Sequence, residues 1–282
     1  MAEFKVIKGK FHVKGYQPDG DSIRFEADNP AHWDTFPWDS ASKKKAAKKQ
    51  LRIEAIDALE THYEGYHQPR PFAMAALERL LKLLGIEDIH YSLNVTTIVK
   101  ANDAQPGFIA TDGLDRYDRP ISMLFPASAK LTDGSLLTSD RLPLEKSINY
   151  ILAREGLVYP TFYTTTDKIF VEKIRKAVRL AREDERGIWA IDRTPDLVLW
   201  DTRTIQEDVT IMPKLFRRLV EFCDAYADFA ELPAYMARQK DNLKLITDPT
   251  PRSLASLMIF DVTGRRMSLT VPIEDILFSP TG

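Results

Sequence analysis

Three short segments of the chain place carboxylates and arginines beside predicted strands. The first is a turn at residues 19–21 that contains two aspartates and leads into a strand. The second carries Arg52 on a strand, with Asp57 and Glu60 just past the end of that strand. The third is the charged run from Asp115 to Arg119, which precedes another strand.

These residue types suggest one kind of chemistry when they meet in a single site. Two carboxylates at neighbouring strand ends can hold a hard cation such as Ca²⁺ or Mg²⁺ through oxygen. Two arginines supply planar, permanently charged groups that match a phosphate. A third carboxylate can act as a general base on a water molecule. Metal, arginines and base together describe the hydrolysis of a phosphodiester.

The elements that would position these residues are read from periodicity. Alternating or β-branched segments predict five strands, and apolar residues at helical spacing predict three helices, each closed by a glycine. The predicted strands are 4–16, 21–25, 51–56, 93–99 and 120–125. The predicted helices are 71–84, 145–155 and 166–186. Short strands followed by helices predict an α+β fold built on a small closed barrel.

A polar insertion, residues 27–50, separates the second predicted strand from the third and contains the run KKKAAKK. Lys48 and Lys49 at its end are candidates for gripping a nucleic-acid backbone, and a solvated loop is the equally weighted alternative. Trp33, Phe36 and Trp38 could stack on bases. We favour packing for these rings, because aromatic side chains dominate protein cores.

Residues 193–282 form a second region with its own pattern, which we call the extension. Apolar residues at helical spacing between Leu215 and Phe229 predict a helix, and residues 257–271 predict a hairpin that turns at Thr263-Gly264. We therefore expect a smaller α/β element after residue 192. It either binds a protein partner or a second copy of the chain, or simply covers part of the barrel.

Composition excludes several classes of protein. The 282 residues carry 39 Lys+Arg against 41 Asp+Glu, and 44% are hydrophobic, which excludes a disordered or fibrous chain. No segment approaches the ~20 apolar residues that span a bilayer, so no membrane partner is expected. The single cysteine, Cys223, excludes an internal disulfide. The charged start MAEFKVIKGK does not resemble a signal peptide, so we expect a cytoplasmic location.

Five segments in order make the chain similar to the staphylococcal nuclease-like (thermonuclease) family. The resemblance covers about residues 1–192, and the family fold is a five-stranded OB-type barrel with three helices. The matching segments are DGDSIRF (19–25), LRIEAIDALET (51–61), DRYDRPIS (115–122), INYILAREGLVY (148–159) and RGIW (186–189).

The resemblance implies a role for each matching residue. Asp21 and Asp57 correspond to the side-chain ligands of one Ca²⁺ ion, and Ala58 to a residue that contributes its backbone oxygen; Mg²⁺ and Mn²⁺ are alternative ions. Arg52 and Arg119 correspond to the two phosphate-binding arginines. The remaining two matches are Glu60, at the position of the general base, and Tyr117, at the position of a tyrosine near the substrate.

Two departures from the family pattern bear on the predicted activity. The family motif DTPE reads Asp57-Ala58-Leu59-Glu60 here. Leu59 in place of proline loosens the turn that aims Glu60, because proline presets the backbone angle φ. Asp118 replaces the usual glycine beside Arg119, and its carboxylate could weaken the hold of that arginine on phosphate.

The leading interpretation is a Ca²⁺-dependent nuclease, most simply an endonuclease, that hydrolyses DNA or RNA with little sequence preference. Water activated by Glu60 would attack the phosphodiester and leave a 3′-phosphate end, as the resemblance implies. The alternative is an OB-fold module that binds nucleic acid or a protein without cleaving it.

Overall fold

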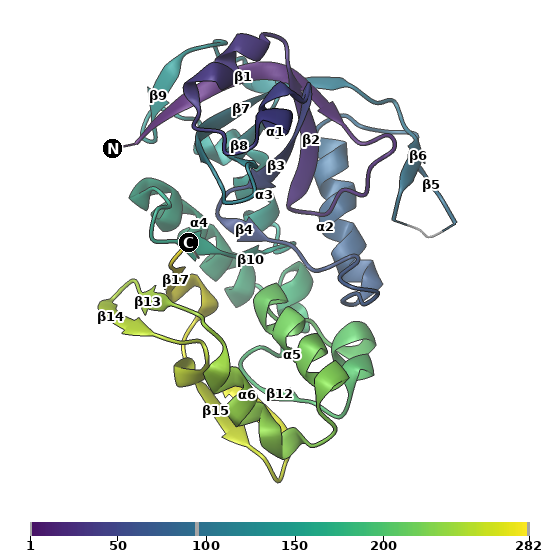
Figure 1. The fold of residues 1–282 in the computed structure, drawn as a ribbon, viewed down its shortest axis with the longest axis vertical. Coiled ribbons are helices and arrows are strands. Elements are labelled where there is room, and N and C mark those ends of the chain that lie inside the picture. Colours follow the sequence, from purple (N-terminus) through teal and green to yellow (C-terminus); the bar gives the residue numbers. More distant parts are fainter. Residues whose placement is uncertain (1, 94–95, 281–282) are drawn as a thin grey trace.

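Five strands close into a mixed β-barrel in the computed structural model, which describes residues 2–93 and 96–280 (Figure 1). They pair in the order β1-β2-β3-β8-β7, and β7 pairs with β1 to close the ring. Only the β3–β8 pairing is parallel. The barrel strands are β1 (Glu3–His12), β2 (Ser22–Ala27), β3 (Lys48–Ile53), β7 (Gln105–Leu114) and β8 (Pro120–Pro126).

The core of the barrel forms because alternate residues of each strand face inward. Phe11 and Phe25 are fully buried, and their rings pack at a centroid distance of 5.0 Å. Gly9 lies against β2 at this point, where an added Cβ would be 2.1 Å from the carbonyl oxygen of Glu26. Glycine is therefore required there for β1 and β2 to approach and close the barrel.

Three longer helices pack against the barrel through apolar stripes. They are α2 (Arg70–Leu83), α3 (Ile148–Arg154) and α4 (Lys168–Glu183), and a short helix α1 (Ala41–Lys45) lies in the insertion. The buried Asn149 of α3 joins helix to barrel, because its Oδ1 accepts from the Leu124 amide at 3.0 Å and its Nδ2 donates to the Glu54 carbonyl at 2.8 Å. The position of α3 is thus set by hydrogen bonds as well as by packing.

Short strands outside the ring complete the first 192 residues. β9 pairs with the edge of β1, β4 pairs with β10, and β5 pairs with β6. Their bounds are β4 (Ile56–Asp57), β5 (His90–Tyr91), β6 (Ile98–Lys100), β9 (Leu136–Thr138), β10 (Tyr159–Pro160) and β11 (Phe162–Tyr163).

One predicted barrel strand was wrong. The segment 93–99 does not enter the barrel: its last residues belong to β6 in a separate two-stranded sheet, and residues 94–95 lie outside the described residues. The fifth barrel strand is β7, which the sequence analysis missed. Pro106, Gly107 and the Asp112-Gly113 pair are residue types that disfavour strands, and Gly113 lies at an irregularity in the register of β7 with β8.

The extension contains two helices and two small sheets, which lie below the barrel in the view of Figure 1. The predicted helix and the predicted hairpin are both present, as α5 and as the antiparallel pair β15–β16. Its elements are β12 (Leu197–Val198), α5 (Pro213–Ala225), α6 (Leu232–Arg238), β13 (Leu243–Leu245), β14 (Asp248–Arg252), β15 (Met258–Asp261), β16 (Arg266–Leu269) and β17 (Ile276–Phe278).

The extension is joined to the first 192 residues by backbone and side-chain contacts. β17 pairs in parallel with β11, so that Leu277 lies opposite Phe162. The buried carboxylate of Glu274 receives two hydrogen bonds from Arg182 of α4, at 2.6 and 2.8 Å. Buried apolar residues of both regions belong to one continuous cluster, which includes Ile53 of β3 and Phe216 of α5.

The structure confirms an α+β architecture with a closed five-stranded, OB-like barrel. Among the described residues, none of the helices has both the length and the apolar character needed to cross a bilayer.

Candidate active site

Two of the predicted segments meet where β2 and β3 begin and end. Ser22 of β2 lies opposite Arg52 of β3, so that Asp21 comes next to the arginine. Gly20 packs against the following segment, and a Cβ there would lie 2.7 Å from the Cβ of Ala58. The hydroxyl of Thr61 donates to Asp19, which ties the same turn to the segment after β4. The turn is therefore held beside Asp57, Ala58 and Glu60.

Negative charge is concentrated where these segments meet. Burial raises the pKa of Asp21 well above its usual value, and the nearby carboxylates of Asp57, Asp19 and Glu60 raise it further. Arg52 acts in the opposite direction but does not cancel the effect. The cluster would be relieved by an added positive charge.

Glu60 has the pKa of a group suited to proton transfer near neutrality. Burial is the main cause that raises its pKa to about 7, and Asp57 and Asp19 add to the rise. Arg217 lowers the pKa of Glu60 through its charge and a hydrogen bond. A carboxylate in this range can both lose and accept a proton near pH 7.

The backbone of Glu60 is held by Gln68, although the turn lacks proline at Leu59. The Glu60 amide donates to Gln68 Oε1 at 3.2 Å, and the Gln68 amide donates to the Glu60 carbonyl at 2.8 Å. Gln68 Nε2 in turn donates to the carbonyl of Ile211 in the extension at 2.8 Å. Fully buried Leu59 adds packing. These contacts replace the constraint that proline would have supplied.

Arg217 of α5 is the residue in this site that the sequence analysis missed. Its Nη1 donates to Glu60 Oε1, and its Nη2 lies 3.3 Å from Asp57 Oδ2. The nearby carboxylates raise the pKa of Arg217, which remains charged. No local pattern could have identified it, because more than 150 residues separate Arg217 from both partners.

The two predicted phosphate-binding arginines line one cavity of about 600 Å³. Arg52 lies over the ring of Tyr163 at 5.0 Å and donates to its hydroxyl at 3.2 Å. Arg119 pairs with Asp115, with 2.6 Å between Nη2 and Oδ2. Each guanidinium is thus oriented by a neighbour while it faces the same space.

The structure explains how Asp118 is accommodated beside Arg119. Its backbone has φ of +57°, the left-handed conformation that favours glycine and that aspartate tolerates better than most residues. Its buried carboxylate accepts from the amides of Asp39 and Ser40 at 3.0 and 2.8 Å. It therefore anchors the insertion, and the residue that pairs with Arg119 is Asp115.

Tyr117 lies at the rim of the cavity and is 52% exposed. The guanidinium groups of Arg116 and Arg119 lie over its ring, at 4.7 and 5.4 Å from the ring centre. Arg116 also donates to the Tyr117 hydroxyl at 2.6 Å. An exposed ring in this place can offer one face to a base.

The two candidate lysines of the insertion differ in environment. Lys48 is half-buried at the start of β3, whereas Lys49 is buried and donates to the carbonyls of Lys43, Lys44 and Ala46, each at 2.6 Å. Lys49 therefore caps the end of α1, a contact that occupies all three of its donors. Burial lowers its pKa.

The aromatic residues of the insertion pack as favoured from the sequence. Trp33 is 3% exposed, and its ring lies 6.0 Å from those of Phe36 and Trp38. The ammonium of Lys49 lies 4.6 Å from the centre of the Trp38 ring. These contacts leave the rings in a structural role.

No group of three or more His, Cys, Asp or Glu side chains is arranged to hold a metal ion within residues 2–93 and 96–280. The donors near the acidic cluster are nonetheless of the kind that a hard cation requires. Asp21 and Asp57 supply carboxylate oxygens, and Ala58 supplies a backbone carbonyl oxygen in the same segment. Ca²⁺ and Mg²⁺ bind oxygen and complete their coordination with water, so the donor types present are those that such an ion uses.

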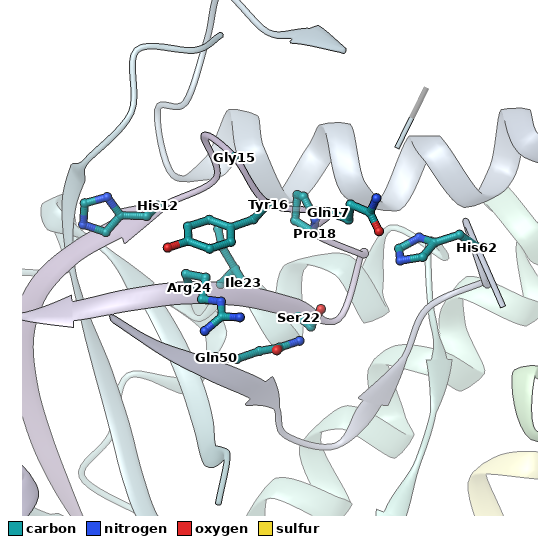
Figure 2. Close-up of a pocket in the computed structure, with 10 residues that line it drawn as sticks. All are labelled: His12, Gly15, Tyr16, Gln17, Pro18, Ser22, Ile23, Arg24, Gln50 and His62. Carbon is teal, nitrogen blue, oxygen red and sulfur yellow. The ribbon is translucent and has the colours of Figure 1, made fainter. Parts of the chain in front are cut away.

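A second, smaller cavity of about 330 Å³ lies beside β2 (Figure 2). Tyr16, Arg24, Gln50 and His12 line it, and Arg24 lies 4.8 Å from the centre of the Tyr16 ring. The catalytic candidates line neither its walls nor its mouth. Its lining carries no set of groups matched to a reaction.

No protein-family model matches this chain, and a search of curated proteins finds no match.

Proposed function

We propose that this protein is a metal-dependent nuclease of the staphylococcal nuclease-like kind, acting on DNA or RNA with Ca²⁺. The observation that supports this most is the meeting of Asp21, Arg52, Asp57 and Glu60 beside a cavity that Arg119 also lines. A scaffold has no physical need to bury so many charges together, since desolvated charges are costly.

The roles follow from charge and position. Arg52 and Arg119 bind the phosphate and stabilise the negative charge that grows on it during attack. Asp21, Asp57 and the Ala58 carbonyl hold the cation, which when bound polarises the phosphoryl oxygen and compensates the acidic cluster. Tyr117 stacks beside the substrate at the rim, and Lys48 contributes positive charge at the start of β3.

Glu60 takes the proton of the attacking water. The water oxygen forms the new bond to phosphorus and the bond from phosphorus to the 5′-oxygen breaks. The released 5′-oxygen takes a proton from solvent to become a 5′-hydroxyl, and a 3′-phosphate end remains. Because the pKa of Glu60 is about 7, a large fraction is ionised and able to accept a proton at neutral pH.

The test is digestion of plasmid, single-stranded DNA and RNA in Ca²⁺, Mg²⁺ or Mn²⁺ and in EDTA, with Glu60→Gln as the key variant. We expect EDTA to abolish cleavage and Glu60→Gln to reduce it roughly 10²–10⁴-fold, the usual contribution of a general base. Glu64→Gln is the matched control, because Glu64 is an exposed glutamate four residues away. Cleavage that survives both EDTA and Glu60→Gln would refute the proposal.

The alternative function is a module that binds nucleic acid without cleaving it. The observation in its favour is that Arg217 already neutralises Asp57 and Glu60, so the carboxylates are balanced by the protein itself. Under this alternative the purified protein would bind oligonucleotides in a salt-sensitive way and never cut them in any of the three metals.

A further inference from the structure

The 600 Å³ cavity has two walls that come from different regions of the chain. The barrel contributes Arg52 and Arg119 to one wall. The extension contributes Lys214 and Arg218 of α5, and Lys240 just after α6. The cavity is therefore a cleft between barrel and extension, with basic residues on both sides.

Helix α5 lies directly over the candidate catalytic carboxylates. Arg217, the neighbour of Arg218 in the sequence, contacts both Glu60 and Asp57. Arg52 of β3 and Arg218 of α5 both line the cavity, so a substrate bound there lies between α5 and β3. The extension thus limits the width of whatever binds.

The extension wall contains buried polar atoms that have no hydrogen-bond partner among the described residues. The carboxylate of Asp241 is only 3% exposed, and its Oδ2 has no hydrogen-bond partner among the described residues. Its ion pairs with Lys214 and Arg218 are long, at 3.3 and 3.4 Å. An unsatisfied buried acceptor between two basic residues suits a ligand that carries both anionic groups and donors.

We infer that the extension forms the second wall of the nucleic-acid site and restricts that site to single strands. The inference rests on the proposed nuclease function and names its substrate class. A cavity of this volume holds a group about the size of one nucleotide. A duplex is two strands wide and stiff, with a persistence length of about 50 nm, and does not enter such a cleft.

A single strand matches the chemistry of both walls. Its phosphates can contact the basic residues of the barrel and of the extension, and its unpaired base N–H groups, such as thymine N3–H, can donate to Asp241. Its bases are free to stack on Tyr117, which a paired base in a duplex is not. Specificity would thus arise from the extension and not from base-specific contacts.

The experiment measures binding without catalysis. Fluorescence anisotropy in EDTA compares a labelled oligothymidylate with its duplex with oligoadenylate, over a range of salt concentrations. We expect the single strand to bind at least tenfold more tightly. Lys240→Ala and Lys214→Ala should each weaken single-strand binding roughly threefold and reduce the salt slope by about 0.7 for each lost phosphate contact.

Arg238→Ala is the matched control. Arg238 is an exposed basic residue two positions from Lys240, but it contacts Tyr226 and does not line the cavity. It should leave affinity and salt slope unchanged. Lys240 is exposed too, so its variant is expected to fold, and circular dichroism verifies this.

Two results would overturn the inference. One is duplex binding as tight as single-strand binding, and the other is a pair of lysine variants that behave like Arg238→Ala. Because these measurements need no metal, they are separate from the test of cleavage. If the protein prefers single strands as expected but never cleaves them, the nuclease function is disproved. The inference that the extension forms the second wall of the binding site would still hold.

Discussion

At the scale of single residues, the candidate site depends on how Glu60 is held. Residue 59 is a leucine, not a proline that would stiffen this turn, and Gln68 and Arg217 hold the backbone and the carboxylate of Glu60. Gln68 is itself bonded to Ile211, so both supports lead to the extension. The lack of a proline at this turn is therefore compensated by contacts that are distant in sequence.

The first prediction concerns the charge of Arg217. A carboxylate must be ionised to accept a proton, so cleavage should rise with pH through about 7 and then level off. Arg217 lowers the pKa of Glu60, and Arg217→Ala should therefore raise that pKa and move the rising limb to higher pH. At pH 7 we expect roughly a fivefold loss for a displacement of one pKa unit, because the ionised fraction of Glu60 falls from about one half to about one eleventh.

The measurement is the pH profile of kcat/KM for wild type, Arg217→Ala and Arg217→Lys. The lysine variant keeps the positive charge and should restore most of the profile. An Arg217→Ala enzyme that is faster than wild type at pH 7, with an unmoved profile, would show instead that Arg217 obstructs the base.

Local motifs were sufficient for most residues of the site but not for all. Asp21, Arg52, Asp57, Glu60 and Arg119 stand in short motifs, and the pairing of β2 with β3 follows from adjacent strands, so their proximity could be predicted. Arg217 could not, because it reaches the site only through the packing of α5. Lys49 stands in a basic run, and only the folded insertion shows that its ammonium faces three carbonyls.

At the scale of elements, the ion pairs between α4 and the turn before β17 join the extension to the first 192 residues. Glu274 has a fully buried side chain, whereas Arg182 and Arg179 are 37% and 41% exposed. If the carboxylate is removed, the two guanidinium groups can be hydrated by solvent. If the arginines are removed, the buried carboxylate of Glu274 cannot reach water and stays unsolvated.

This asymmetry gives the second prediction. Arg182→Leu should lower the free energy of unfolding by about 3 kcal/mol, because it leaves a buried carboxylate poorly paired. Glu274→Gln should cost less. Lys173→Ala, also on α4, breaks a solvent-exposed ion pair with Glu145 in the turn before α3 and should cost about 0.5 kcal/mol or less. Urea denaturation measures all three, and equal costs would contradict the argument.

Helices and strands were predicted correctly where their residues follow a regular apolar pattern, and incorrectly where proline, glycine or strand propensity misled. Helices α2, α3 and α4 carry apolar residues at helical spacing, so periodicity was enough to find them; α2 and α3 end just before Gly85 and Gly156, whereas α4 already ends at Glu183. β7 was missed because Pro106, Gly107 and Gly113 interrupt it, yet tertiary pairing with β1 and β8 holds it in the barrel. The β-branched segment 93–99 shows the reverse error, since strand propensity alone does not provide a neighbour in the sheet.

At the scale of the whole molecule, barrel and extension share one hydrophobic cluster. The third prediction is therefore a single cooperative unfolding transition, in which calorimetric and van't Hoff enthalpies agree. Differential scanning calorimetry of the full chain tests it. Two resolved transitions would mean that residues 193–282 are a separate folding unit, and would favour a docking role over a structural one.

The parallel pairing of β17 with β11 has a consequence for synthesis. The barrel leaves the ribosome first, whereas Arg217 and then β17 are translated later. A nascent chain thus presents the carboxylates of the site before the arginine that pairs with them and before the second wall of the cleft. The order of translation itself delays completion of the site until the extension has been made.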